Sequence, residues 1–300
     1  MNIVSFTHCS ASKTIKNNLS ILNLGDFQTL KKLSSEWVKS VNKTSPSCVG
    51  KNLYNGGGFR KLVKESGDKN FFIISAGLGL INSTDNIPSY ECTVAEGKKG
   101  SIGNHLKEKL DVKQWWNDLL EIKYSRGSIY ENIKEYDLIL FSLTSDYLRM
   151  VSEDLNKITK KFYIFTGSKD LAIKLGFEKN LMPYTEVFDG PDGKLRGTNR
   201  DFPQRTHVDF LNRLNKFGNF NEAHKSVEID MQQWSPPTKH NNAKKTDEEI
   251  LNLIQFHEDK YAKVSDLLHF FRHELKVACE EKRFKTLYRN FKEDHKCLIH

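Results

Sequence analysis

The stretch from residue 71 to residue 94 constrains the fold of this chain most, because it joins a strand-like run to a polar loop. Its opening letters, FFIISAGLGL, are mainly bulky and apolar, which is typical of a strand buried on both faces. The run breaks into small residues at Ser75-Ala76-Gly77. Ligands bind beyond the carboxyl ends of such strands in open α/β sheets, so the stretch predicts a binding site. A plain surface turn is the alternative interpretation.

The same arrangement occurs four times along the chain. Strand-like runs at 2–7, 71–74, 136–143 and 161–166 each end in a small, polar turn ahead of a helical pattern. Repeated strand–helix units of this kind predict an α/β fold with four strands in a mainly parallel sheet. The four polar turns are then expected to meet at one edge of that sheet.

The pattern divides the chain into a main domain and a smaller unit. Residues 1–217 form the predicted α/β domain, and the polar, proline-containing segment 218–245 is typical of a linker or an extended excursion. A capping box, Thr246 with Glu249 three residues later, begins a C-terminal helical unit at 246–300. Those helices suit either a small DNA-contacting module or simple packing on the main domain.

The overall composition limits the classes of partner and compartment. The 300 residues carry a formal net charge of +8, which both a polyanionic partner and a lysine-rich solvated surface explain. No apolar run approaches the roughly 20 residues of a membrane span, and the first residues do not resemble a signal peptide. Five cysteines without framework spacing favour a reducing compartment. We therefore expect a cytoplasmic protein with no membrane association, no structural zinc and no cofactor.

Carboxylates in the polar turns are the candidate catalytic groups. Asp85 and Glu91 flank the Pro88-Ser89-Tyr90 corner that follows the second strand, and Asp146 lies in the turn after the third. Carboxylates at the carboxyl edge of a sheet suit general acid–base work or the stabilisation of positive charge. We therefore expect Asp85 or Glu91 to be the catalytic carboxylate, with Asp146 as a further catalytic candidate.

Small, polar and basic residues near the same strand ends are the candidate substrate contacts. Lys13, behind two serines, suits an anion, and a solvated lysine is the alternative. A basic, glycine-containing loop near residue 200 suits phosphates and an unstacked base, and a structural ion-pair loop is the alternative. The predicted substrate-binding residues are Cys9, Ser10, Lys13, Ser75, Tyr90, Tyr147, Gly167, Asn199, Arg200 and Arg205.

Short motifs in this order resemble one group of proteins. They are CSASK at 9–13, LY at 53–54 with FR at 59–60, SAGLGL at 75–80, IPSYECT at 87–93 and SDYL at 145–148. The group contains bacterial and phage proteins related to the peroxide-stress YaaA proteins and to the catalytic domain of archaeosine synthase. Its second-strand motif usually reads SAKxGL…xPxYDxT, so here Gly77 replaces a lysine and Glu91 replaces an aspartate.

The resemblance covers about the first two-thirds of the chain and implies a fold and a functional theme. The implied fold is a three-layer sandwich around a central four-stranded, mainly parallel sheet, as in the uracil-DNA glycosylase-like superfamily. The functional theme of these relatives is the nucleobase, through glycosylases and through deazaguanine modification. Some relatives in phage defence act as DNA glycosylases on hypermodified bases.

Residues and resemblance together predict a DNA glycosylase for a modified base, with nucleic acid as the partner and DNA favoured over tRNA. A carboxylate would position water and stabilise an oxocarbenium-like transition state, and the base would leave the stack to enter the site. Two alternatives remain open. One is a deazaguanine-type enzyme that modifies tRNA or DNA bases, and the other is a non-catalytic DNA-binding stress protein resembling YaaA.

Overall fold

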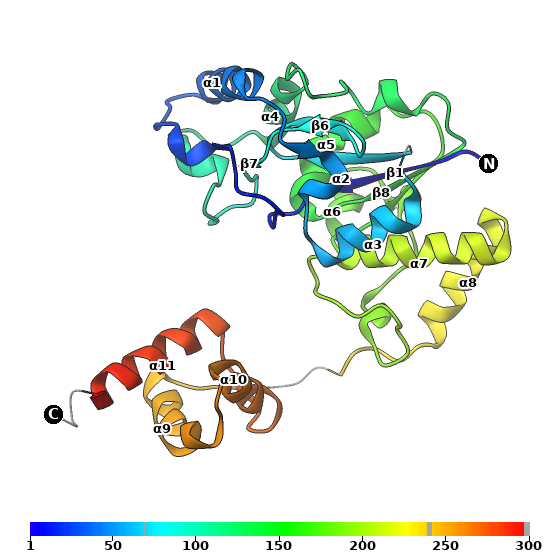
Figure 1. Cartoon of the computed structure of the whole chain (residues 1–300). Helices are drawn as coiled ribbons and strands as arrows, with labels where there is room; N and C mark the ends of the chain where they lie inside the picture. Colours follow the sequence, from blue (N-terminus) through cyan, green and yellow to red (C-terminus); the bar gives the residue numbers. More distant parts are fainter. Residues whose placement is uncertain (69, 239–241, 297–300) are drawn as a thin grey trace. The chain divides into compact units, whose positions relative to one another are not determined.

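The chain forms two compact units, Met1–Pro237 and Thr238–His300. The computed structural model describes residues 1–68, 70–238 and 242–296, and Figure 1 shows the order of their helices and strands. Each unit has its own hydrophobic core. The two units are described separately below.

The first unit is built on a five-stranded sheet with the order β5-β4-β1-β8-β9. The parallel strands expected from the sequence are all present, and a fifth strand, β5, pairs antiparallel with β4. The prediction of four strands was therefore incomplete, because a tight turn at residues 76–78 sends the chain straight back along β4. The strands are β1 (Ile3–His8), β4 (Phe71–Ser75), β5 (Gly79–Asn82), β8 (Leu138–Ser142) and β9 (Phe162–Phe165).

One face of the sheet is an aromatic layer. Phe6 of β1 stacks between Phe72 and Phe141 of the neighbouring strands, with ring centroids 5.1 and 4.7 Å away. Further along β1 on the same face, the ring of His8 lies 5.3 Å from that of Tyr147. Helices α4 and α5 pack together, and α1 packs on α4 (Figure 1). Their bounds are α1 Leu30–Lys43, α4 Val112–Leu119 and α5 Ser145–Asn156.

The other face of the sheet lies against α7, with polar contacts at β1 and an aromatic contact at β9, where the rings of Phe165 and His207 stack 4.6 Å apart. Gln204 Nε2 donates to Thr7 Oγ1 at 2.9 Å, and Ser5 Oγ and His207 Nε2 share a hydrogen bond of 3.2 Å. Helix α7 also packs against α3 and contacts β8 and β9. These helices are α3 (Gly57–Ser66) and α7 (Phe202–Phe217), and the shorter helices and strands of the unit are α2 Gly50–Leu53, α6 Lys169–Lys174, β2 Leu19–Ser20, β3 Cys48–Val49, β6 Asn86–Ile87 and β7 Tyr90–Glu91.

The segment predicted to be a linker, 218–245, contains a helix instead. Helix α8 occupies Phe220–Gln233 and is capped by Asn219, whose side chain accepts from the backbone N–H of Glu222. Ala223 and Val227 are fully buried, and α8 packs against α7. The sequence analysis missed this helix because only a narrow apolar stripe interrupts an otherwise polar stretch.

The second unit is helical, as predicted, and it begins with the expected capping box. Thr246 Oγ1 accepts from the backbone N–H of Glu249, and the Glu249 carboxylate accepts from the N–H of Thr246. The buried rings of Phe271 and Phe284 lie 4.9 Å apart in its core. Its elements are β10 Ala243–Lys244, α9 Asp247–His257, α10 Val264–His273, β11 Val277–Ala278 and α11 Glu281–Lys296.

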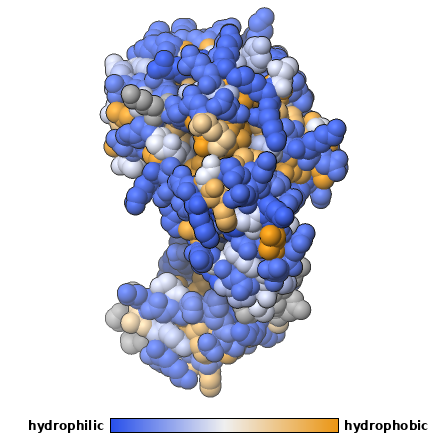
Figure 2. Space-filling model, turned by 90° about the vertical axis from the view of Figure 1, so that its right-hand side faces the viewer, coloured by the Kyte–Doolittle hydropathy of each residue, from blue (hydrophilic) through white to orange (hydrophobic). Residues whose placement is uncertain are grey.

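The face shown in Figure 2 is mainly hydrophilic. On the face in Figure 2, apolar side chains gather in small patches between polar and charged ones. None of the helices in the described residues has the length and apolar character that a membrane span requires.

Candidate functional site

The strand order of the sheet marks one position for ligand binding. Strand β1 lies between β4 and β8, so the chain crosses to one side of β1 first and to the other side later. In open α/β sheets such a reversal opens a crevice at the carboxyl ends of the strands. The turn after His8, the turn after Ser75 and the turn after Ser142 therefore form the expected location of the site.

Five buried side chains at this edge share hydrogen bonds and are called the tyrosine–thiol cluster here. The hydroxyl of Tyr90 is at its centre, 2.6 Å from Ser75 Oγ and 3.1 Å from the hydroxyl of Tyr54. It also donates to Cys9 Sγ at 3.5 Å, and Cys9 Sγ lies 3.0 Å from the hydroxyl of Tyr147. The cluster joins the ends of β1 and β4 to β7 and to the start of α5. Four of its members were predicted to bind substrate.

The hydroxyl groups of the cluster are neutral at physiological pH. Burial raises the pKa values of Tyr90 and Tyr147 well above the ordinary tyrosine value, and nearby Cys9 raises them further. Burial likewise raises the pKa of Tyr54. Desolvation disfavours the phenolate form, so these side chains keep their protons. These tyrosine hydroxyls are therefore hydrogen-bond donors rather than anions.

The turn at the end of β4 is held in place by two indoles. Trp37 Nε1 donates to the carbonyl of Gly77 and Trp115 Nε1 to the carbonyl of Ala76, both at 2.8 Å. A Cβ atom at position 77 would lie 2.7 Å from two ring atoms of Tyr90. Glycine at 77 therefore lets Tyr90 approach the turn, and the lysine found at this position in the resembling group would collide with that ring.

Lys13 places its ammonium group over this cluster. Its Nζ lies 4.5 Å from the ring centroid of Tyr90 and 5.9 Å from that of Tyr54. Burial lowers the pKa of Lys13, while Cys9, Cys92 and Glu91 act in the opposite direction. Among the described residues Lys13 Nζ has no ion pair, so its contacts are the two aromatic faces.

Two of the three predicted catalytic carboxylates lie at this edge. Glu91 is partly buried and accepts from Ser20 Oγ at 2.9 Å, and its charge acts on Lys13. Asp146 lies in the first turn of α5, next to Tyr147, and pairs with Arg149 at 3.4 Å. The structure therefore places both carboxylates next to members of the tyrosine–thiol cluster or to Lys13.

Asp85 does not belong to this edge of the sheet, and the prediction that places it with the other turns was wrong. The antiparallel strand β5 carries the chain back, so Asn82 pairs with Phe72 at the amino end of β4. Asp85 Oδ2 accepts from the backbone N–H of Asn82 at 2.8 Å and from Arg126 Nε at 2.9 Å. Its carboxylate therefore stabilises a turn at the opposite end of the sheet.

Arg205 is also a structural residue rather than a phosphate ligand. Its side chain is 1% exposed and pairs with Asp189 at 2.6 Å and Asp201 at 3.0 Å. The remaining guanidinium donors bind the carbonyls of Leu195 and Thr198. All of these donors bind groups inside the protein. For Arg205, the structure therefore supports the alternative interpretation, a structural ion-pair loop. The neighbouring Asn199 and Arg200 are exposed.

His8 was not predicted as a site residue, although it ends β1 directly before the CSASK motif. Its Nδ1 donates to the carbonyl of Ser142 at 3.1 Å, which ties the ends of β1 and β8 together. Burial, and to a smaller extent the charge of Arg200, lower the pKa of His8 to about 4, although the hydrogen bond to Ser142 acts in the opposite direction. His8 is therefore neutral at physiological pH, and Arg200 lies close enough to the edge to act on it.

The other predicted contacts are at the ends of β1 and β9. Ser10 Oγ accepts from the backbone N–H of Ser12 at 3.2 Å, and Gly167 is exposed after β9.

Tyr54 and Cys92 belong to the site but were not predicted as site residues. The thiol of Cys92 donates to the carbonyl of Ala76 at 3.6 Å, and burial raises its pKa. Both residues could have been predicted from the motifs that contain them, LY for Tyr54 and IPSYECT for Cys92.

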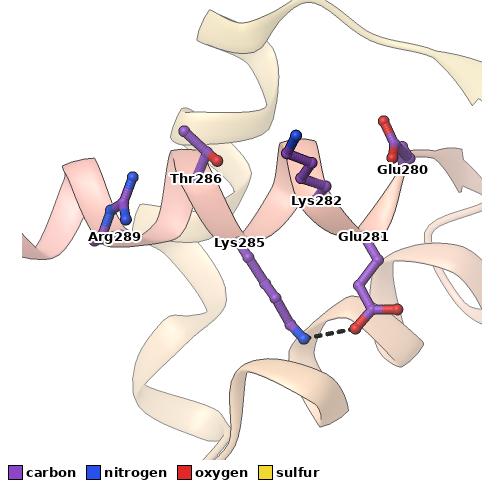
Figure 3. A pocket seen from close by; sticks show the side chains of 6 residues that line it. All are labelled: Glu280, Glu281, Lys282, Lys285, Thr286 and Arg289. Carbon is purple, nitrogen blue, oxygen red and sulfur yellow. Dashed lines mark hydrogen bonds and ion pairs between the residues drawn. The ribbon is translucent and has the colours of Figure 1, made fainter. Parts of the chain in front are cut away.

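A separate depression of about 580 Å³ lies on the second unit. It is open and is lined by α11 and the residue before it, with a single ion pair between Lys285 and Glu281 among the side chains drawn in Figure 3. Its two carboxylates lie at the start of α11 and its three cations follow along the helix. Its lining residues are Glu280, Glu281, Lys282, Lys285, Thr286 and Arg289.

Comparisons with known proteins found one partial similarity. No protein-family model matches the chain, and no solved structure matches it. A beta-1,3-glucan-binding protein from Penaeus vannamei is 27% identical to the chain over 173 residues. The matched region is 55% of this chain, which spans about a tenth (11%) of the length of that curated relative. This similarity assigns the chain to no family.

Proposed function

We propose that the chain is a DNA glycosylase that hydrolyses the N-glycosidic bond of a modified base, such as a hypermodified base of phage DNA. One observation carries the proposal. At the carboxyl edge of the sheet, Glu91 and Asp146 accompany protonated tyrosine hydroxyls and Lys13, around the strand at which the strand order reverses. The proposed mechanism gives no role to Asp85 or Arg205.

This chemistry matches the needs of glycosidic bond cleavage. The transition state carries positive charge on the sugar, which a carboxylate stabilises, and negative charge on the departing base, which hydrogen-bond donors stabilise. Glu91 or Asp146 would supply the carboxylate and position the attacking water. The hydroxyl of Tyr147 would supply a donor, because it keeps its proton at neutral pH.

The proposal includes a uracil-DNA glycosylase-like fold for the first unit and DNA as the partner. Four parallel strands with helices packed on both faces support a three-layer sandwich of the uracil-DNA glycosylase-like kind. Exposed Asn199 and Arg200 near His8 would contact the phosphates of the flipped nucleotide. Free Cys9, Cys48, Cys92 and Cys279 support a cytoplasmic location, where phage DNA is encountered.

Base release from phage DNA tests the proposal. Genomes of several phages with different modified bases are incubated with the wild type, Glu91→Gln, Asp146→Asn and Asp85→Asn, and the released small molecules are identified by mass spectrometry. We expect release by the wild type and by Asp85→Asn, and a loss of about 10²-fold or more for the variant that lacks the catalytic carboxylate. Equal release by all four proteins would remove both carboxylates from the mechanism.

The products also separate the proposal from its alternatives. A glycosylase leaves an abasic site, whereas a base-modifying enzyme leaves an altered base in the strand. A DNA-binding protein without catalysis would bind with a strong salt dependence and release nothing. Either result would replace the glycosylase assignment.

A further inference from the structure

Lys13 has an unusual position for a lysine on a polar loop. It follows β1 in the CSASK turn, and its backbone pairs with that of Tyr54. Its Nζ lies over the rings of Tyr90 and Tyr54, whose hydroxyls belong to the tyrosine–thiol cluster. The amine is therefore directed at the centre of the candidate site and is partly removed from water.

Two roles are available to such an amine, and its surroundings favour one of them. A lysine that only holds a phosphate works best as a hydrated cation at the rim, where exposed Arg200 and Asn199 already lie. Removal from water favours the neutral amine, which is a nucleophile, and burial does lower the pKa of Lys13. The charge of Glu91 acts on Lys13, although the two groups form no ion pair, so a proton passed between them would travel through water.

We propose that Lys13 is the nucleophile of a combined glycosylase and abasic-site lyase, which attacks the sugar C1′ and forms a Schiff base with it. This inference rests on the proposed glycosylase function and extends it from hydrolysis to covalent catalysis. Glu91 is then the proton carrier rather than the group that positions water. The Tyr147 hydroxyl keeps its role as a donor to the departing base.

The steps balance without an external oxidant or reductant. The neutral Nζ attacks C1′, and the N-glycosidic bond breaks with its electron pair leaving on the base, which takes up a proton from water. Nζ then gives one proton to Glu91, which passes it to O4′ as the C1′–O4′ bond opens, and a protonated imine remains. Loss of the C2′ proton expels the 3′-phosphate with the C3′–O electron pair, and water hydrolyses the imine and frees Lys13.

An abasic-site duplex tests this step without knowledge of the target base. A labelled duplex with one 2′-deoxyribose abasic site is mixed with the full chain and sodium borohydride, which reduces an imine to a stable amine. The wild type should become cross-linked to DNA and should cut the strand 3′ to the abasic site when borohydride is omitted. Mass spectrometry of tryptic peptides should locate the adduct on Lys13.

Three variants separate a nucleophile from a cation that holds phosphate. Lys13→Arg keeps the charge and lacks a nucleophilic amine, Lys13→Gln removes both, and Lys16→Gln removes an exposed lysine three residues away. We expect cross-linking to fall at least tenfold in both Lys13 variants and to be unchanged in Lys16→Gln. Circular dichroism and thermal melting confirm that each variant is folded.

The outcomes keep the two proposals distinguishable. Undiminished cross-linking by Lys13→Arg, or an adduct on another lysine, overturns the role of Lys13. Release of bases from phage DNA without any cross-link also overturns it and leaves the hydrolytic glycosylase intact. Cross-linking through Lys13 without base release from any phage genome sustains Lys13 as a lyase nucleophile and overturns the glycosylase function.

Discussion

At the scale of single residues, Arg205 is the clearest case of a charge that serves the fold. It is 1% exposed, and it pairs with both Asp189 and Asp201. Removal of one partner of a buried ion pair leaves uncompensated charge, which costs about 3–5 kcal/mol. We therefore expect Arg205→Met to lower the free energy of unfolding by that amount in urea titrations. The exposed Arg200→Met should change it by less than about 0.5 kcal/mol, and equal effects of the two would contradict this assignment.

His8 makes stability depend on pH. Its pKa is about 4 in the folded protein, below its ordinary value of 6.5, so the unfolded chain binds a proton first as the pH falls. The contribution of His8 is complete above pH 6.5 and is lost as the pH falls towards 4. Between pH 7 and pH 5 the loss amounts to about 2 kcal/mol.

The variant His8→Asn isolates this effect, because an amide can still donate to the carbonyl of Ser142 and does not titrate. Urea unfolding is measured for both proteins at pH 7 and pH 5. The wild type should lose about 2 kcal/mol more than the variant over this interval. The same loss in both would assign the pH dependence to other groups, such as His207, whose pKa burial lowers to about 3.

At the scale of elements, the turn between β4 and β5 controls the position of Tyr90. A Cβ at Gly77 would lie 2.7 Å from Tyr90 ring atoms and 3.1 Å from Trp37. Gly77→Ala should therefore displace Tyr90 from Ser75, destabilise the first unit by about 1–3 kcal/mol and weaken base release. Thermal melting and the base-release assay measure both effects. Gly57→Ala is the matched control, since nothing lies within 4 Å of its added Cβ.

The same turn shows how far elements could be predicted from the sequence. The four parallel strands are short, mainly apolar runs, each followed by a polar turn, so their presence and the meeting of their carboxyl ends followed from local pattern. The return of β5 depends on a tight turn within one apolar run, and no local pattern distinguished it from a loop. Asp85 was assigned to the wrong edge for that reason. Tyr90, five residues later, is back at the carboxyl end of β4, where its hydroxyl lies 2.6 Å from Ser75 Oγ.

At the scale of the whole molecule, the two units have separate hydrophobic cores. The core of the second unit is formed by α9, α10, α11 and β11, and the rings of Phe271 and Phe284 are in contact within it. No residue of this cluster belongs to the core of the first unit. Units with their own cores are expected to unfold as separate cooperative transitions.

Phe284→Ala tests this independence in the full chain. Truncation of a fully buried phenylalanine costs about 3–5 kcal/mol, which is as much as a core of this size is expected to supply. Hydrogen exchange should therefore show lost protection in α9, α10 and α11, while amides of β1, β4, β8 and β9 keep theirs. Phe256→Ala, at a ring that is 74% exposed in the same unit, should leave both patterns unchanged. Loss of protection in the sheet strands of Phe284→Ala would show instead that one cooperative core spans the chain.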